Sequence, residues 1–140
     1  MKLKYVYHGS TTSGIKELEP RKRYTPGILG KEAKPAIYAA ADPAYAAGHA
    51  FPWKSSEGFD IFEKDNRVIL IVPKKFKKRL DQQIYIYKLP IKNFKLLKPD
   101  TPKALIYISY KKVEPVEVKA FKNIIEALKF YGGEVEYIYP

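Results

Sequence analysis

Residues 7–10 read Tyr-His-Gly-Ser, and residues 37–42 read Ile-Tyr-Ala-Ala-Ala-Asp. These two segments indicate the fold more clearly than any other part of the chain. The aromatic and β-branched residues that lead up to His8 predict a strand that delivers this side chain to its C-terminal end. Gly9 and Ser10 are residue types found in turns, so we expect the chain to turn directly after the histidine.

The second segment predicts a strand followed directly by a helix. The strand covers residues 36–40. Asp42 is a favourable N-cap, and Pro43 suits the first helical position, where a missing N–H costs nothing. We expect the helix to run to about residue 50, because Pro52 stops it.

The rest of the chain predicts mainly short strands. Residues 21–34 contain proline and glycine without apolar periodicity, and a loop of this length is a candidate lid. Residues 55–66 are predicted as a polar connection. Further strands are expected at 67–72, 84–89, 105–110, 113–120 and 134–139, with an amphipathic helix from residue 121 that stops at Gly132. The prediction is one α+β domain over residues 1–140, with about seven short strands and two main helices.

The composition excludes several classes of function. The chain has no cysteine, which excludes disulfides and thiol nucleophiles, and its two histidines are too few for a zinc site, so no metal site is predicted. No apolar stretch approaches the roughly 20 residues that cross a bilayer, and the N-terminus lacks the pattern of a signal peptide. We therefore expect a cytoplasmic protein that does not bind membranes.

The net charge of +11 is concentrated in one segment. Residues 73–112 contain twelve Lys or Arg and two Asp, so this segment carries +10 and the remainder +1. Such a segment favours a nucleic acid or an acidic protein as partner, although a solvated lysine surface has the same composition. Lysine predominates, and arginine is the better residue for bidentate phosphate recognition, which weakens the nucleic-acid interpretation.

The segments 7–10 and 37–42 resemble the nicotinamide-pocket signature of the ADP-ribosyltransferase superfamily, and the later strands are similar to those of its small bacterial and phage members. The resemblance implies a split β-sheet core, NAD as substrate, and transfer of ADP-ribose to a macromolecular acceptor. It implies that His8 and Gly9 hold the ribose and the nicotinamide amide, and that Tyr38 stacks on the nicotinamide ring. The residues implied to bind NAD are His8, Gly9, Ser10, Arg21, Tyr38 and Tyr45, the last as a second wall of the pocket.

The glutamate of the family's His-Tyr-Glu triad has no counterpart here. The resemblance puts Ile106 at that position, and an isoleucine neither binds a ribose hydroxyl nor stabilises an oxocarbenium-like transition state. Glu114 is among the nearest acids along the chain, so the catalytic set that we predict is His8, Tyr38 and Glu114. The alternatives are another acid, a shifted register, or a domain that binds without transferring.

Three further interpretations stay open. RNA 2′-phosphotransferases of the same superfamily use arginine and histidine to bring NAD to an RNA phosphate, and Arg21 and Arg23 are candidates for such a pyrophosphate contact, although both also fit an exposed surface. His49 is interpreted as a cation at a helix end or as a packed side chain. A binding module of the same fold, or a nucleic-acid-binding protein that uses only the basic segment, would have the same composition.

Overall fold

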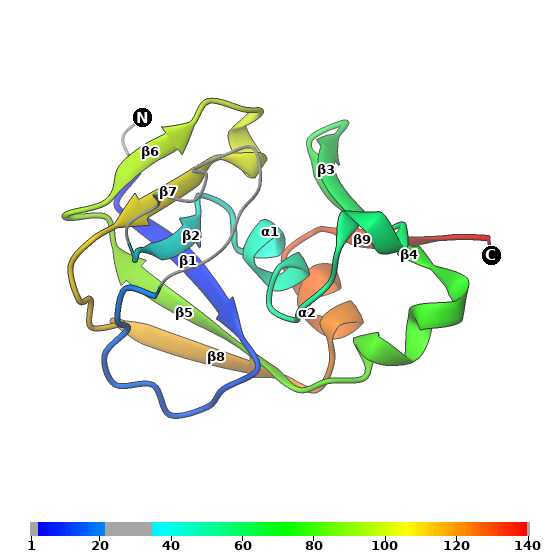
Figure 1. Ribbon diagram of the computed structural model, residues 1–140, viewed down its shortest axis with the longest axis horizontal. Coiled ribbons are helices and arrows are strands. Elements are labelled where there is room, and N and C mark those ends of the chain that lie inside the picture. Colours follow the sequence, from blue (N-terminus) through cyan, green and yellow to red (C-terminus); the bar gives the residue numbers. More distant parts are fainter. Residues whose placement is uncertain (1–2, 22–34, 140) are drawn as a thin grey trace.

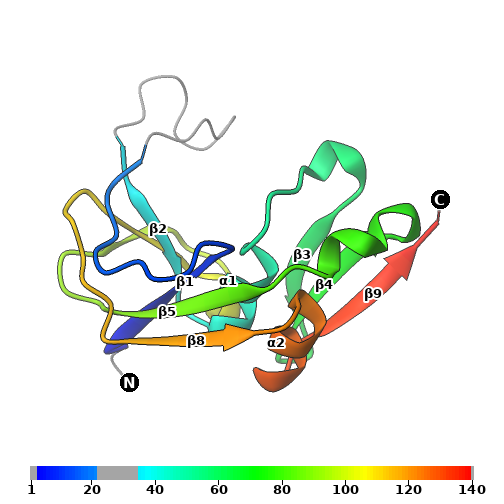
Figure 2. The same cartoon turned by 90° about the horizontal axis from the view of Figure 1, so that it is seen from below.

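The computed structural model describes residues 3–21 and 35–139 and has an α+β architecture, in which two helices lie between two sheets (Figures 1 and 2). The larger sheet is antiparallel throughout and has the order β6 (Lys95–Lys98), β7 (Ile106–Ser109), β2 (Ile37–Ala40), β1 (Tyr5–Ser10), β5 (Ile84–Pro90) and β8 (Glu117–Phe121). The smaller sheet has the order β3 (Asp60–Lys64), β4 (Arg67–Pro73) and β9 (Glu134–Ile138), with β9 parallel to β4. The helices are α1 (Pro43–Gly48) and α2 (Ile124–Phe130), and the 3₁₀ segments are η1 (Ser55–Glu57), η2 (Lys74–Leu80) and η3 (Pro102–Ala104).

Strand β1 is longer than the sequence indicates. The prediction that the chain turns after His8 is wrong, because β1 pairs with β5 from Tyr5 opposite Pro90 to Ser10 opposite Tyr85. The glycine and the serine are thus part of a regular ladder. The histidine lies within a strand and not at its end.

β3 was not predicted from the sequence, and residues 94–97, which overlap β6, fit either a short strand or a turn; both strands lie at the edge of a sheet. β3 falls in the segment expected to be a polar connection, and β6 carries a Leu-Leu pair between two lysines. β3 forms because it pairs with the apolar β4 across a tight turn. The two turn residues, Asp65 and Asn66, have φ values of 52° and 63°, which is the backbone of a hairpin turn. Pairing with a neighbour, and not its own apolar pattern, makes this segment a strand.

The predicted helix caps are confirmed, but both helices are shorter than expected: the second begins at Ile124 and not at Phe121, which is the last residue of β8. Asp42 caps α1 by accepting a 2.8 Å hydrogen bond from the N–H of Ala44, and Pro43 takes the first helical position. The helix ends two residues earlier than expected, at Gly48. Gly132 has a φ of 81° after α2, as expected for a left-handed stop. No helix in the described residues is long and apolar enough to span a membrane.

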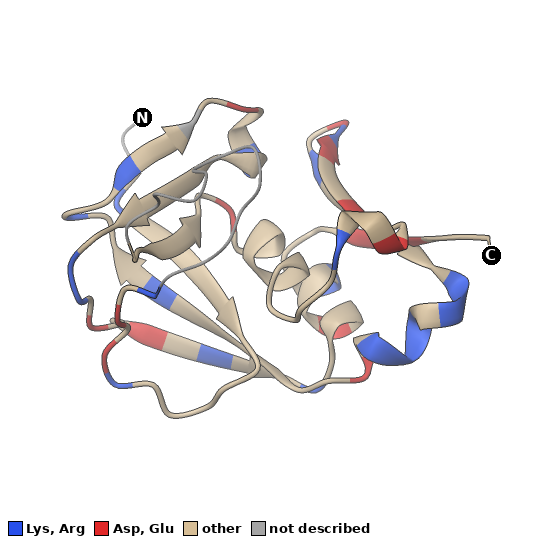
Figure 3. Cartoon of the chain, viewed as in Figure 1, with Lys and Arg blue, Asp and Glu red and all other residues tan. Residues whose placement is uncertain are grey.

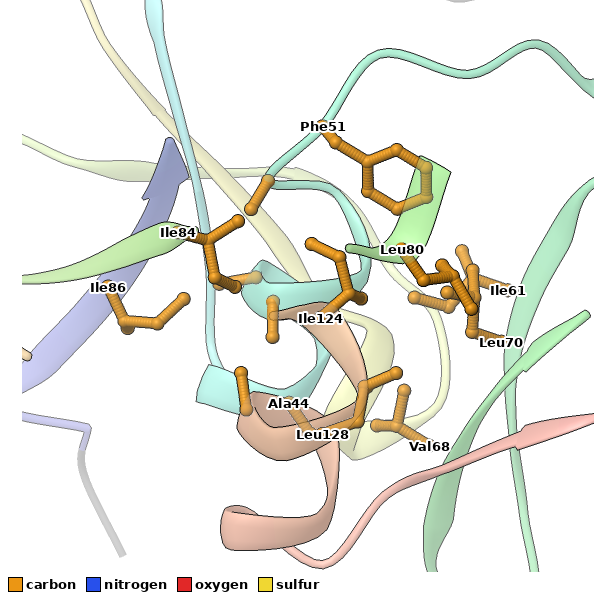
Figure 4. Packing of buried hydrophobic residues seen from close by; sticks show 14 of the residues in the cluster. Ala44, Phe51, Ile61, Val68, Leu70, Leu80, Ile84, Ile86, Ile124 and Leu128 are labelled. Carbon is orange, nitrogen blue, oxygen red and sulfur yellow. The ribbon is translucent and has the colours of Figure 1, made fainter. Parts of the chain in front are cut away.

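Both faces of the large sheet are covered. On one face, Ile84 and Ile86 of β5 pack against α1 and α2, and this core continues to Leu70 in the small sheet (Figure 4). On the other face, Tyr87 and Leu89 belong to a second cluster that residues 11–20 cover. The alternation of side chains along each strand separates the two clusters.

Candidate functional site

Two adjoining cavities lie where β1, β2 and the C-terminal end of α1 meet. The first has a volume of about 540 Å³ and the second about 320 Å³, and both fall in the range of roughly 300–1,000 Å³ typical of small-molecule sites. Four residues line both cavities: His8, Gly9, Tyr38 and His49. They include both histidines of the chain.

The cavities exist because β1 and β2 part from each other. The two strands pair at one position only, Tyr7 opposite Ala40. A continued antiparallel ladder would set Gly9 opposite Tyr38. Instead, Nδ1 of His8 donates a 2.7 Å hydrogen bond to the main-chain carbonyl of Tyr38. Because a carbonyl only accepts, this bond places the proton of a neutral His8 on Nδ1 and the lone pair on Nε2.

The main chain of Gly9 borders this parting. The carbonyl of Lys4 accepts a 3.1 Å hydrogen bond from Ile91 on the β5 side of β1. Since main-chain groups alternate along a strand, those of Gly9 point to the opposite side, toward β2. None of the described residues pairs with Gly9 across that gap. Its N–H and C=O are therefore positioned to meet a ligand that both donates and accepts, such as a primary amide.

The missing side chain of Gly9 has a second cause that the sequence did not reveal. A Cβ at this position would collide with the carbonyl oxygen of Ala46 and would lie 2.8 Å from Cβ of Ala50. Glycine is therefore required for the close packing of α1 on β1. The absence of a side chain at Gly9 allows α1 to pack closely on β1, whereas the main chain of Gly9 borders the cavities.

The first cavity is the more polar one. Arg21 and Ser10 line it, as do two acidic residues, Glu17 and Glu19. Arg21 lies at the base of the long loop, where its N–H and C=O bond those of Ala36 at 3.2 and 3.0 Å. The Ser10 hydroxyl accepts a 3.0 Å bond from a neighbouring main-chain N–H. The predicted lid, residues 22–34, and with it Arg23, lies outside the described residues.

A buried tyrosine of the large sheet holds part of the first cavity's wall in place. The hydroxyl of Tyr87 donates a 2.7 Å hydrogen bond to the carbonyl of Thr12 and accepts a 3.3 Å bond from the N–H of Ile15. Both partners line the first cavity. The wall is thus fastened to the sheet by a side chain that is 1% exposed.

The second cavity is mainly aromatic and aliphatic. Tyr38, Tyr45 and Ile106 line it. Burial, with smaller contributions from the negative charges of Asp100 and Asp60, raises the pKa of Tyr45 to about 12, so this ring is a neutral wall at physiological pH. Ile106 takes part in the lining at the position where the resemblance expects a glutamate. The second cavity therefore has a hydrocarbon wall there.

Glu114 is not brought to either cavity. It is exposed and follows Val113, whose main chain is bridged to that of Leu18 by hydrogen bonds of 3.0 and 2.7 Å. Leu18 lines the first cavity, but Glu114, which follows this bridge, is not among the residues that line either cavity. The acidic residues that line the first cavity are instead Glu17 and Glu19, and the Glu19 carboxylate forms a 3.5 Å ion pair with Lys112.

The predicted site includes Tyr45 but omits two rings next to it: His49, which lines both cavities, and Trp53, which lines the first. The His49 ring lies 4.8 Å from that of Tyr45 and 5.4 Å from that of Trp53, nearly parallel to the latter at 19°. Trp53 is fixed by a 2.8 Å hydrogen bond from its Nε1–H to the carbonyl of Gly48. Tyr45 and His49 are four residues apart at the end of α1, a spacing that places two side chains on one side of a helix, whereas Trp53 lies beyond the helix.

The basic segment 73–112 does not form one surface. Five of its basic residues lie on η2 beside the small sheet, and the others lie on or next to the large sheet (Figure 3). The two groups belong to opposite ends of the molecule in Figure 1. A partner that binds through this charge would have to use one group or the other.

Comparison with protein-family models gives one match, which covers residues 7–138. The model is that of a family of unknown function, DUF6886. The match includes every strand around the cavities except the first two residues of β1. No curated protein and no solved structure matches the chain.

Proposed function

Because the chain belongs to the DUF6886 family, whose function is unknown, we propose a function from its site: an NAD-binding, ADP-ribosyltransferase-like protein that transfers ADP-ribose to a macromolecular acceptor. The observation that supports this proposal is the parting of β1 and β2. It puts the main chain of Gly9, the imidazole of His8 and the ring of Tyr38 around two joined cavities. These are the residues on which the resemblance to the superfamily rests.

NAD fits the division of the site into two cavities. The smaller one, with the rings of Tyr38 and Tyr45, suits the flat nicotinamide ring. The carboxamide of that ring is a primary amide, which matches the N–H and C=O of Gly9. The larger, more polar cavity takes the pyrophosphate and adenosine, with Arg21 as the cation. Nε2 of a neutral His8 accepts a hydrogen bond from a ribose hydroxyl.

The proposed reaction needs no further reactant. The bond between C1 of the ribose and the nicotinamide nitrogen breaks, and its electron pair neutralises the pyridinium. A bond from an oxygen or nitrogen of the acceptor to the same carbon forms, and the acceptor loses a proton. Positive charge develops on the sugar during this step, and a carboxylate would stabilise it. Ile106 supplies none, so Glu17 and Glu19 of the first cavity are the acids to test.

A second candidate function is a binding module of the same fold. The observation that favours it is the hydrocarbon wall that Ile106 gives the second cavity. Such a module would hold NAD or a related nucleotide without breaking the nicotinamide bond. Wild-type activity separates the two candidates, because only an enzyme releases nicotinamide.

Calorimetry with NAD tests the site that both candidates share. We expect Tyr38→Ala to weaken NAD binding at least tenfold, equivalent to about 1.4 kcal/mol, because a stacked ring contact is lost. Tyr137→Ala is the matched control, since Tyr137 is an exposed tyrosine of the small sheet. An absence of NAD binding by the wild type, or equal loss in both variants, would refute the assignment of the pocket.

Nicotinamide release from labelled NAD tests the chemistry. The enzyme hypothesis predicts release by the wild type and a loss of release in Glu17→Gln or Glu19→Gln while NAD still binds. NAD binding without any release, with protein and nucleic-acid acceptors supplied, favours the binding module. Glu114→Gln is the control, because Glu114 lies away from both cavities.

A further inference from the structure

Four exposed lysines lie on the short helix η2. In a 3₁₀ helix, residues three apart lie on the same side. Phe76 and Arg79 share the inner side, where the guanidinium carbon lies 4.2 Å from the centre of the phenyl ring, and Leu80 is fully buried. Of the other residues of the helix, Lys74 and Lys77 share one side and Lys75 and Lys78 share another, and all four lysines are exposed. We call these four residues the lysine ridge.

Arg79 does not add its charge to the ridge. Its guanidinium donates two hydrogen bonds to the carboxylate of Glu57, at 3.0 and 2.7 Å. These bonds lower the pKa of Glu57 below its ordinary value, so the pair stays ionised and neutralises itself. The charge that a partner meets on η2 is therefore that of the four lysines.

A column of stacked rings fastens η2 to the wall of the first cavity. Phe76 stacks on Phe59 with 5.7 Å between ring centres, and Phe59 stacks on Trp53 at the same spacing. Two steps of 5.7 Å put Phe76 at most 11.4 Å from Trp53, which lines the cavity. Phe59 is 2% exposed, so the column is part of the core and keeps this spacing.

The surroundings of the ridge favour a nucleic-acid strand over an acidic protein. The apolar side chains of η2, Phe76 and Leu80, face inward, so the ridge lacks the buried anchors on which protein partners depend. Beside the ridge, Tyr139 is 79% exposed, and its hydroxyl accepts a 2.8 Å hydrogen bond from Nζ of Lys74. An exposed ring next to lysines is a platform on which an unpaired base stacks while the lysines hold phosphates.

We propose that the lysine ridge binds the phosphate backbone of single-stranded nucleic acid and holds it beside the first cavity, which makes a nucleic acid the acceptor in the proposed transfer. The role as acceptor rests on the proposed function, whereas the binding does not. Recognition is insensitive to sequence, because point charges and one stacking ring read no base edges. Contact with four phosphates predicts a slope of about −2.8 when log K for a single strand is plotted against log salt.

Fluorescence anisotropy with labelled single-stranded DNA and RNA 12-mers of mixed sequence tests the binding. We expect Lys77→Glu combined with Lys78→Glu to weaken binding more than tenfold and to flatten the salt dependence. Lys92→Glu combined with Lys111→Glu changes the net charge equally in turns beside the large sheet, and we expect at most a threefold loss. Circular dichroism confirms that both variants are folded, and the milder Lys77→Gln with Lys78→Gln replaces the first pair if it is not.

Three results would overturn the proposal: no binding of either oligonucleotide by the wild type, equal loss in the two double variants, or tighter binding of polyglutamate than of the oligonucleotides. The Tyr38→Ala variant separates this proposal from that of NAD binding. It should bind oligonucleotides like the wild type, even though its NAD affinity is reduced. Transfer of label from NAD to the oligonucleotide, lost in the ridge variant but not in the control pair, establishes the acceptor role, and transfer that is unchanged in the ridge variant refutes it.

Discussion

Replacing Gly9 with alanine should destabilise the protein whatever the cavities bind. The new methyl group would collide with the carbonyl oxygen of Ala46 and lie 2.8 Å from Cβ of Ala50. A main-chain oxygen cannot rotate away as a side chain does, so α1 and β1 have to move apart. Overpacking of a core typically costs 1–3 kcal/mol, and we expect about 3 kcal/mol here because the obstacle is main chain.

Urea unfolding, followed by the fluorescence of Trp53, measures this loss, since Trp53 is the single tryptophan of the chain. A loss of about 3 kcal/mol corresponds to a Tm lower by roughly 10 °C for a chain of this size. Ser10→Ala is the control in the same strand, because it removes one exposed hydrogen bond, worth about 1 kcal/mol or less. A Gly9→Ala protein within 0.5 kcal/mol of the wild type, roughly the effect of an ordinary surface substitution, would refute the packing argument.

Other predictions follow from the core and from the tyrosines. Phe59→Ala should cost about 3–5 kcal/mol in urea unfolding and the exposed Phe130→Ala less than 1, and equal losses would contradict the importance of the ring column. The pKa values of Tyr45 and Tyr131 are raised to about 12, chiefly by burial, so unfolded tyrosines ionise first as the pH rises. The free energy of unfolding should therefore be intact below pH 10 and fall between pH 10 and 12, and Tyr45→Phe should flatten this fall. Tyr87→Phe removes both hydrogen bonds that hold the wall of the first cavity. It should lower the free energy of unfolding by about 1–2 kcal/mol and weaken NAD binding. Unchanged NAD affinity would show that the wall stays in place without these bonds.

Local chemistry decided which elements could be predicted from the sequence. β4 and β5 carry apolar runs of their own, and the helix caps at Asp42 and Gly132 depend on one residue each. β3 could not be predicted in this way, because its strand conformation comes from pairing with β4. The extension of β1 through Ser10 has the same cause, since β5 continues beside it.

The candidate site was predicted in its central residues but not in its full extent. His8, Gly9 and Tyr38 line both cavities, as the motif indicated. His49 was interpreted as a cation at a helix end or as a packed side chain, and it is the C-cap residue of α1 and packs against two rings. Its place in the lining of both cavities was not predicted, because nothing in a single sequence shows that the end of α1 packs against β1 and β2. Glu114 was chosen for its nearness along the chain, but its side chain is exposed and lines neither cavity.

The hydrogen bond from His8 to the carbonyl of Tyr38 takes the place of strand pairing between β1 and β2, so the sheet gives up some stability in order to keep the cavities. Each further pair between β1 and β2 would complete the ladder and make the sheet more regular, and the same pairs would close the cavities. The His8 side chain gives the carbonyl of Tyr38 a hydrogen-bond donor without bringing β1 and β2 together, so the gap between the two strands stays open. Substitutions at residue 8 that allow β1 and β2 to pair along their full length should therefore raise the free energy of unfolding. The same substitutions should close the cavities and prevent ligand binding.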